Sequence, residues 1–129
     1  MNEDELRERT KRFALRVLSL VRAMPRDQEA RVVSRQLFRC ATSVAANYRA
    51  ACRARSKKDF TSKIGIVEEE ADESGFWLEF IVDGGIMKAN RVSELLTEAD
   101  ALRRIFTASR MTAMGRTSAK QKSSIKNPK

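Results

Sequence analysis

The stretch SKKDFTSKIGIVEEEADESGFWLEFIVDGG, residues 56–85, contains the beginning, the buried face and the end of one long helix. Ser56 and Asp59 form an S-x-x-D pattern, which is typical of a helix N-terminus. The apolar residues that follow recur every three or four positions, as on one face of an α-helix; they are Phe60, Ile64, Val67, Ala71 and Leu78. Gly84 and Gly85 then form a natural C-cap and turn. These signals predict a helix that begins after Ser56 and ends at the Gly-Gly pair.

The same kinds of signal predict three further helices. Before this one, Asp27 offers an N-cap and no helix-breaking residue appears before Ser56. Its apolar stripe is Val33, Leu37, Cys40, Val44, Tyr48 and Ala51. The first helix is capped by Asn2 and stopped by Pro25, because the residue before a proline avoids helical geometry. The last helix begins at Asn90 or Ser93 and carries Val92, Leu95, Leu96, Ala99, Leu102 and Phe106.

Four amphipathic segments joined by short connections predict an all-α protein, an antiparallel up-down-up-down four-helix bundle over residues 1–114. Helical periodicity ends after Gly115. Residues 115–129 contain five basic residues, no acid and almost nothing apolar, which predicts a disordered basic tail.

The residue content disfavours an enzyme. The chain of 129 residues has no histidine, which excludes Ser-His-Asp and Cys-His catalysis and histidine-ligated zinc. No phosphate-binding loop, dinucleotide-binding glycine motif or nucleophile elbow is present. Adjacent acids over residues 68–73 point in different directions on a helix and do not form a metal site. We therefore expect no catalytic residue, no metal and no cofactor.

The location expected is the cytoplasm. No apolar run approaches the ~20 residues of a membrane span, and the N-terminal residues MNEDELRERT lack the apolar segment of a secretion signal. Cys40 and Cys52 are expected to be reduced thiols, because on one helix they would be too far apart for a disulfide.

The formal net charge of +9 is unevenly distributed. Residues 31–63 contain nine basic residues and one acid, whereas residues 64–87 contain seven acids and no basic residue. On the second helix the arginines fall opposite the apolar stripe; they are Arg31, Arg35, Arg39, Arg49 and Arg53. Such a row is usually a solvated face, but arginine is also the residue suited to bidentate phosphate or carboxylate recognition.

If the second and third helices form an antiparallel hairpin, one part of this positive charge lies beside acids and the other part does not. Arg31, Arg35 and Arg39 would lie level with acids between Glu69 and Glu79. The turn end would keep an unpaired basic surface with only Asp59 beside it, comprising Arg49, Arg53, Arg55, Lys57, Lys58 and Lys63. This end is the predicted nucleic-acid-binding site, through phosphate contacts rather than base stacking.

The third helix carries a second apolar surface opposite its core stripe, which includes Ile66, Phe76, Trp77 and Phe80. Because a helix in a monomeric bundle needs one apolar face, these side chains predict a subunit contact, or cover a neighbouring helix or loop of the same chain. Glu69 and Glu73 on the same side could meet the Arg49–Arg53 surface of a neighbouring subunit. Asn47, on the apolar side of the second helix, is expected to bond across the bundle, with a contact in a functional groove as the alternative.

The segments ATSVAANYRAACRARSKKDF (residues 41–60) and IVEEEADESGFWLEF (residues 66–80) resemble four-helix bundle proteins first known as products of intervening sequences inside 23S rRNA genes. The matching positions are Ser43, Asn47, Arg55, Ser56, Lys57, Lys58, Phe60, Glu69, Glu73, Trp77, Leu78 and Glu79. The resemblance implies an antiparallel bundle that assembles as a ring-like homopentamer. A related branch, the accessory variability proteins of diversity-generating retroelements, implies association with RNA or DNA and with a reverse transcriptase.

The sequence thus predicts a non-catalytic, oligomeric bundle that binds RNA or DNA through an Arg/Lys surface. The alternative is a protein-interaction scaffold whose arginine row docks an acidic partner.

Overall fold

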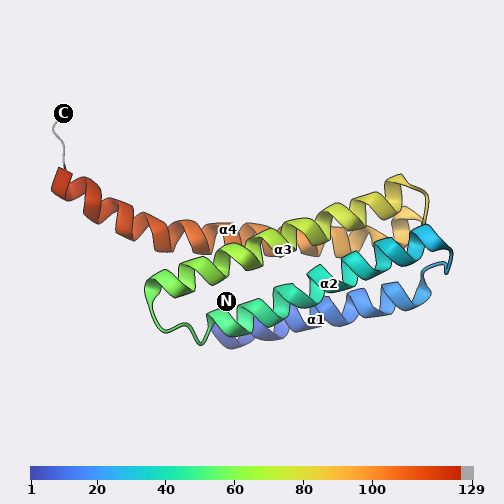
Figure 1. Cartoon of the computed structure of the whole chain (residues 1–129), viewed down its shortest axis with the longest axis horizontal. Helices are drawn as coiled ribbons and strands as arrows, with labels where there is room; N and C mark the ends of the chain where they lie inside the picture. The colour runs from blue at the N-terminus through green and yellow to red at the C-terminus, as the bar shows by residue number, and fades with distance from the viewer. Residues whose placement is uncertain (126–129) are drawn as a thin grey trace.

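The computed structural model describes the backbone of residues 1–125 and the side chains of residues 1–115. All regular structure in that range is helical, so the predicted fold class is confirmed. The helices are α1 (Glu3–Ala23), α2 (Gln28–Ala51), α3 (Lys57–Asp83) and α4 (Ala89–Ile125). They lie side by side and alternate in direction, with α4 extending past the α2–α3 turn (Figure 1). No described helix is long and apolar enough to cross a membrane.

The predicted caps define the beginnings of the first three helices. The Asn2 side chain accepts from the Glu5 amide at 2.8 Å, and the Glu5 carboxylate accepts from the Asn2 amide at 2.9 Å. Asp27 accepts from the Ala30 amide, and Ser56 accepts from the Asp59 amide, each at 3.0 Å. These bonds satisfy backbone N–H groups that have no partner inside the helix.

Two predicted helix ends differ from the structure. α2 ends at Ala51 rather than just before Ser56, because the chain turns there and the Arg53 and Ala54 amides donate to Ala50 and Ala51. α4 continues as helix beyond Gly115 to Ile125, so the expected boundary at residue 114 is not a helix end. Residues 126–129 and the side chains from residue 116 onward lie outside the described range, so the predicted disorder is not tested at residues 126–129.

One core runs along the bundle axis and is built from the predicted stripes. Among its fully buried side chains are Phe13, Leu37, Leu78 and Phe106. Each helix contacts its neighbour in the chain, and α1 also contacts α4. At that last contact the Arg9 guanidinium donates twice to Glu98, at 2.7 and 2.8 Å. The closed ring of four contacts fixes which face of each helix remains outside.

Candidate nucleic-acid interface

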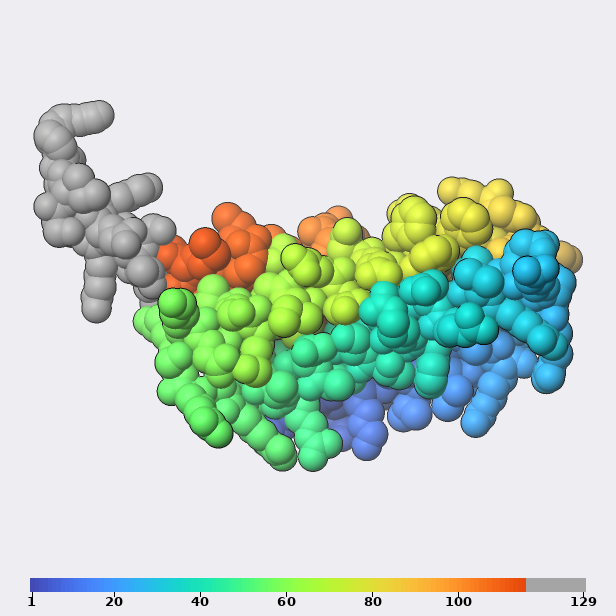
Figure 2. Space-filling view, viewed as in Figure 1, coloured from blue at the N-terminus to red at the C-terminus, as the bar shows by residue number. Residues whose placement is uncertain are grey.

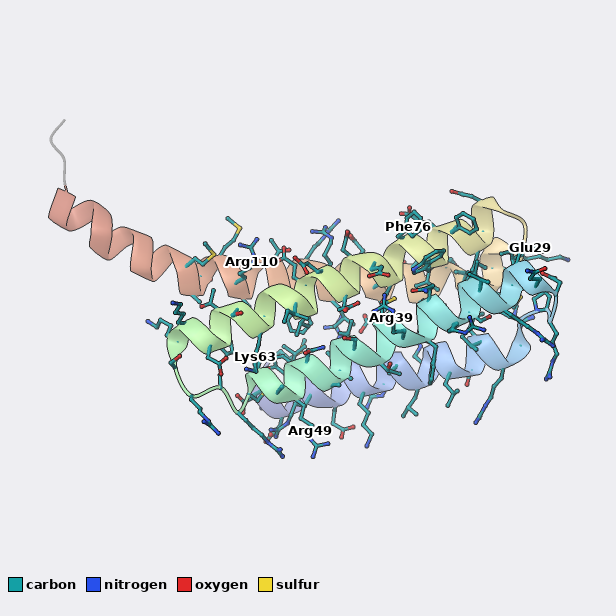
Figure 3. All side chains as sticks on the ribbon, viewed as in Figure 1. Glu29, Arg39, Arg49, Lys63, Phe76 and Arg110 are labelled. Atoms are coloured by element: carbon teal, nitrogen blue, oxygen red, sulfur yellow. The ribbon has the colours of Figure 1, made fainter. Side chains whose placement is uncertain are left out.

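The outer face of α2 is a row of exposed arginines. Arg31, Arg35 and Arg49 lie on the helix, Arg53 lies in the turn that follows it, and all four are exposed. None of them forms an ion pair with another residue of the described chain. Arg49 points away from the bundle, on the side of α2 turned from α3 (Figure 3). We call these four residues the α2 arginine row.

Arg39 is the exception, because it lies between α2 and α3 (Figure 3). Its Nη2 donates to Glu73 Oε2 at 2.5 Å, and its Nη1 is 3.4 Å from Glu70 Oε1. The bond to Glu73 raises the pKa of the Arg39 guanidinium further above its usual value. Of the three arginines that the hairpin register placed beside the acids, Arg39 therefore forms the predicted pairs, and Arg31 and Arg35 form none within residues 1–115.

The turn after α2 and the first turn of α3 add three more exposed cations. They are Arg55, Lys57 and Lys58, and no ion pair of the described residues includes them. Together with Arg49 and Arg53 they form the surface that we call the basic tip. The segment that carries it, coloured green, lies at the lower left of the view, at the end of the bundle where α2 turns into α3 (Figure 2). Five of the six predicted nucleic-acid-binding residues are thus brought together and left free of ion pairs within the described chain.

Lys63, the sixth, is engaged by Asp59. Its Nζ donates to Asp59 Oδ1 at 2.7 Å, and Asp59 Oδ2 also accepts from the Arg55 amide at 3.3 Å. The Lys63 bond first, and the Arg55 amide second, lower the pKa of the Asp59 carboxyl. Asp59 is therefore used to hold the start of α3, and it forms no ion pair with the other cations of this surface.

The acidic first turn of α1 lies at the same end of the bundle, which the sequence analysis did not consider. Glu3 is close enough to Cys52 to contribute to the raised pKa of that thiol, whose main cause is burial. Asp4 pairs with Arg7, and Glu5 is held in the N-terminal capping box. The sequence already indicated this placement, because in an antiparallel bundle the first helix begins at the end where the second helix ends.

Asn47 does not bond across the bundle, so that prediction is wrong. Its Nδ2 donates to the Ser43 carbonyl oxygen at 3.0 Å and to Ser43 Oγ at 2.7 Å, both one turn earlier in α2. A side chain that bonds to its own helix does not set the register between helices. In the buried core, a polar contact between helices comes instead from Ser74, whose Oγ donates to Cys40 Sγ at 3.3 Å.

The outer face of α3 combines acids with exposed aromatic rings. Ile66, Phe76 and Phe80 are 41%, 52% and 45% exposed. Trp77 is partly buried against the core, and its Nε1 donates to Glu73 Oε2 at 3.3 Å. The rings of Phe76 and Trp77 are 4.9 Å apart in an edge-to-face arrangement. Of the predicted subunit contact, Ile66, Glu69 and Phe80 lie exposed, whereas Glu73 and Trp77 are partly engaged within the chain.

On its other side α3 is tied to α4, through a contact that sequence reasoning missed. Glu68 accepts from Arg110 and, at 2.7 Å, from the Thr107 hydroxyl. The Arg110 bond is the main cause of the lowered pKa of the Glu68 carboxyl. Among the described residues, no three Cys, Asp or Glu side chains form a group that could hold a metal ion.

Comparisons with known proteins give one family and one fold. The model of the 23S rRNA-intervening sequence protein family matches residues 3–108. A solved structure of a protein of unknown function from the S23 ribosomal protein family of Bacteroides thetaiotaomicron is similar, with a TM-score of 0.75 and 26% sequence identity. The match covers 81% of this chain and 96% of that one. A search of the curated proteins finds no significant match.

Proposed function

The chain belongs to the 23S rRNA-intervening sequence protein family, and on this premise we propose that it is a non-catalytic, oligomeric bundle that binds RNA or DNA through phosphate contacts. The observation that supports the proposal is the basic tip, where five exposed cations form no ion pair with the described residues. None of the acids at this end of the bundle forms an ion pair with a tip residue: Asp59 pairs with Lys63, Asp4 pairs with Arg7, and Glu3 forms no ion pair within the described residues.

A concentration of free cations on one surface favours a polyanionic ligand. Three of the five tip residues are arginines, whose planar guanidinium matches the geometry of a phosphate group. Each phosphate that is neutralised releases condensed counterions, so affinity should fall steeply as salt rises. Because phosphate contacts carry no base information, binding should depend little on sequence.

The test is a fluorescence titration with labelled RNA and DNA of mixed sequence at two salt concentrations. The tip variant is Arg53→Ala/Arg55→Ala/Lys57→Ala. Its matched control, Arg26→Ala/Lys88→Ala/Arg91→Ala, removes the same charge from three exposed cations in or next to the turns at the other end of the bundle. We expect the tip variant to weaken binding and to flatten the salt dependence by about 0.9 logarithmic unit per lost phosphate contact.

Two results would contradict the proposal. Equal losses in the tip variant and in the control would mean that net charge alone attracts the nucleic acid. An unmodified protein that binds neither RNA nor DNA, but binds a polyglutamate-rich protein in a tip-dependent way, would support the scaffold alternative.

We further propose that the chain is a homo-oligomer with the outer face of α3 at the subunit contact. Fully burying a large apolar side chain is worth roughly 1.5–3 kcal/mol, and three such side chains are exposed on this face. The family resemblance suggests a ring of five subunits. Phe76 and Phe80 are better probes than Trp77, because neither has a hydrogen-bonding side-chain atom and both are more exposed than that partly buried indole.

Light scattering at micromolar concentration tests the assembly. The unmodified chain should show a multiple of 14.6 kDa, and Phe76→Ser/Phe80→Ser should lower that mass while the helical circular dichroism stays unchanged. Leu15→Ser is the matched control, since Leu15 is 53% exposed but lies on α1. A monomer mass for the unmodified protein would exclude the interface.

A further inference from the structure

We propose that the nucleic acid is a duplex, and that it lies lengthwise along α2 so that Arg31 and Arg35 extend the contact made by the basic tip. This inference rests on the proposed function and names its ligand class. The observation behind it is the shape of the α2 arginine row, which continues from the tip along the full length of one helix.

The length of the row matches one turn of duplex. Arg31 and Arg49 are 18 residues apart in α2, which is about 27 Å at 1.5 Å per residue. Arg53 lies one turn further, so the row spans about 33 Å. A turn of B-form duplex is about 34–36 Å long and contains about 10 base pairs. The helix therefore presents two cations near each end of a span that is close to one turn of a duplex.

The sign of the charge along the row is uniform. Within α2 the one acid is Glu29, in the first turn, and Arg39 is drawn away from the row by Glu70 and Glu73. A duplex carries one negative charge per about 1.7 Å of its axis, so it offers phosphates both to Arg31 and Arg35 and, about 21 Å further along the helix, to Arg49 and Arg53. A compact anion would be satisfied by the tip alone and would leave Arg31 and Arg35 without a role.

The positions of the aromatic side chains disfavour a single strand. Proteins that hold single strands stack successive bases on exposed rings beside the cationic groove. Here Phe38 is the one aromatic residue exposed on α2, at 37%, while Tyr48 is buried against Phe106. The exposed pair Phe76 and Phe80 lies on α3, among the acids. The α2 surface thus offers phosphate contacts without a series of stacking platforms.

The experiment combines ligand length with a row variant. The ligands are labelled duplexes of 6 and 20 base pairs and the matching 20-nucleotide single strand, each in DNA and RNA. The proteins are the full chain, Arg31→Ala/Arg35→Ala, and the control Arg26→Ala/Arg91→Ala, which removes two exposed cations outside the row. A 6-base-pair duplex is about 20 Å long and cannot reach from Arg53 to Arg35.

We expect the row variant to weaken binding of the 20-base-pair duplex by roughly ten- to fiftyfold at 0.1 M salt, and to lower the salt slope by about 1.8 for two lost contacts. Binding of the 6-base-pair duplex and of the single strand should change less than twofold, as should every affinity of the control. Circular dichroism and thermal melting check folding, and Arg31→Gln/Arg35→Gln serves as a second row variant with the same expected losses.

Three outcomes are informative. Single strands bound as tightly as the long duplex, or a row variant no weaker than its control, would overturn the duplex inference and leave tip-dependent binding intact. No binding of any nucleic acid to the unmodified chain would overturn the proposed function itself. If the row variant loses affinity for the long duplex alone, the result would support both the duplex inference and the proposed function.

Discussion

The outer faces of α2 and α3 lie next to each other on the bundle and use their charges in opposite ways. On α3, three of the acids are engaged by arginines of the two neighbouring helices: Glu70 and Glu73 by Arg39 of α2, and Glu68 by Arg110 of α4. On α2, the four residues of the arginine row form no ion pair within the described chain. These three acids of α3 thus contribute to holding the bundle, whereas the positive charge of the α2 arginine row is not used by the fold.

A charged face opposite a buried stripe therefore has no fixed role. A residue on the edge of a helix that faces a neighbour is within reach of a partner, and one on the open face is not. Substitutions on α2 and α3 should therefore separate a face that holds the fold from a face that is left for a ligand.

The strongest contrast comes from removing the whole row. Arg31→Ala/Arg35→Ala/Arg49→Ala/Arg53→Ala should weaken duplex binding by roughly a thousandfold at 0.1 M salt, if each arginine makes one phosphate contact. The free energy of unfolding should change by less than about 0.5 kcal/mol per site, because exposed positions without partners contribute little. Titration and urea unfolding measure the two quantities. A large loss of stability would show that the row holds the fold after all.

Substitutions on the buried and outer faces of α3 should differ clearly in their effect on the free energy of unfolding. Leu78→Ala removes a fully buried side chain and should lower the free energy of unfolding by about 2–5 kcal/mol. Phe80→Ala, on the outer face, should lower it by less than about 1 kcal/mol when the protein is studied as a monomer. Both substitutions are made in a chain that also carries Phe76→Ser, so that assembly does not contribute. Urea unfolding then measures the free energy of unfolding of each variant. Similar losses for both would place Phe80 in the core of its own chain.

Removing the acids that bind Arg39 should add a fifth unpaired cation to the outer face of α2. Glu70→Gln/Glu73→Gln removes the acids that hold Arg39, so its guanidinium can join the row, and duplex affinity should rise by roughly tenfold at 0.1 M salt. Stability should fall by no more than about 1 kcal/mol, as usual for partly exposed pairs. The additional change Arg39→Ala should cancel the gain in affinity; a gain that persists would come from the higher net positive charge of the chain instead.

The Glu68–Arg110 contact should contribute to the loss of stability of the protein at acid pH. The pKa of the Glu68 carboxyl is lowered in the folded chain from about 4.5, mainly by Arg110. Its contribution is therefore fully present above pH 4.5 and is lost as pH falls through the lower folded value. Between pH 6 and pH 3 the unmodified chain should lose more stability than Glu68→Gln, measured by urea unfolding. Equal losses would mean that the pair adds nothing.

Replacing Gly75 should have the smallest effect on the free energy of unfolding, and the effect should be stabilising. Gly75 faces α4, where a Cβ would meet the Ala99 side chain at 4.0 Å, an ordinary contact distance. Gly75→Ala should therefore raise the free energy of unfolding by about 0.5–1 kcal/mol, because alanine favours helix over glycine. A destabilised variant would reveal a closer approach of α3 to α4 than this structure has.

Most of the fold could be predicted because its signals are local. The caps at Asn2, Asp27 and Ser56 and the stop at Gly84 each depend on a few neighbouring residues. The end of α2 at Ala51 was missed, since no proline or glycine marks the turn that begins at Cys52. The end of α4 was misplaced because Gly115 and fading periodicity do not by themselves stop a helix.

The sequence by itself determined the four apolar stripes, the positive excess over residues 31–63 and the acids that follow it. Only the tertiary structure decided which of these charges meet. Arg35 and Arg39 are one turn apart on the same helix, yet Arg39 is held by Glu70 and Glu73 and Arg35 is left outside. The reason is that the core fixes the rotation and register of each helix, and a few tens of degrees of rotation separate a side chain that reaches a neighbouring helix from one that reaches only solvent or a ligand.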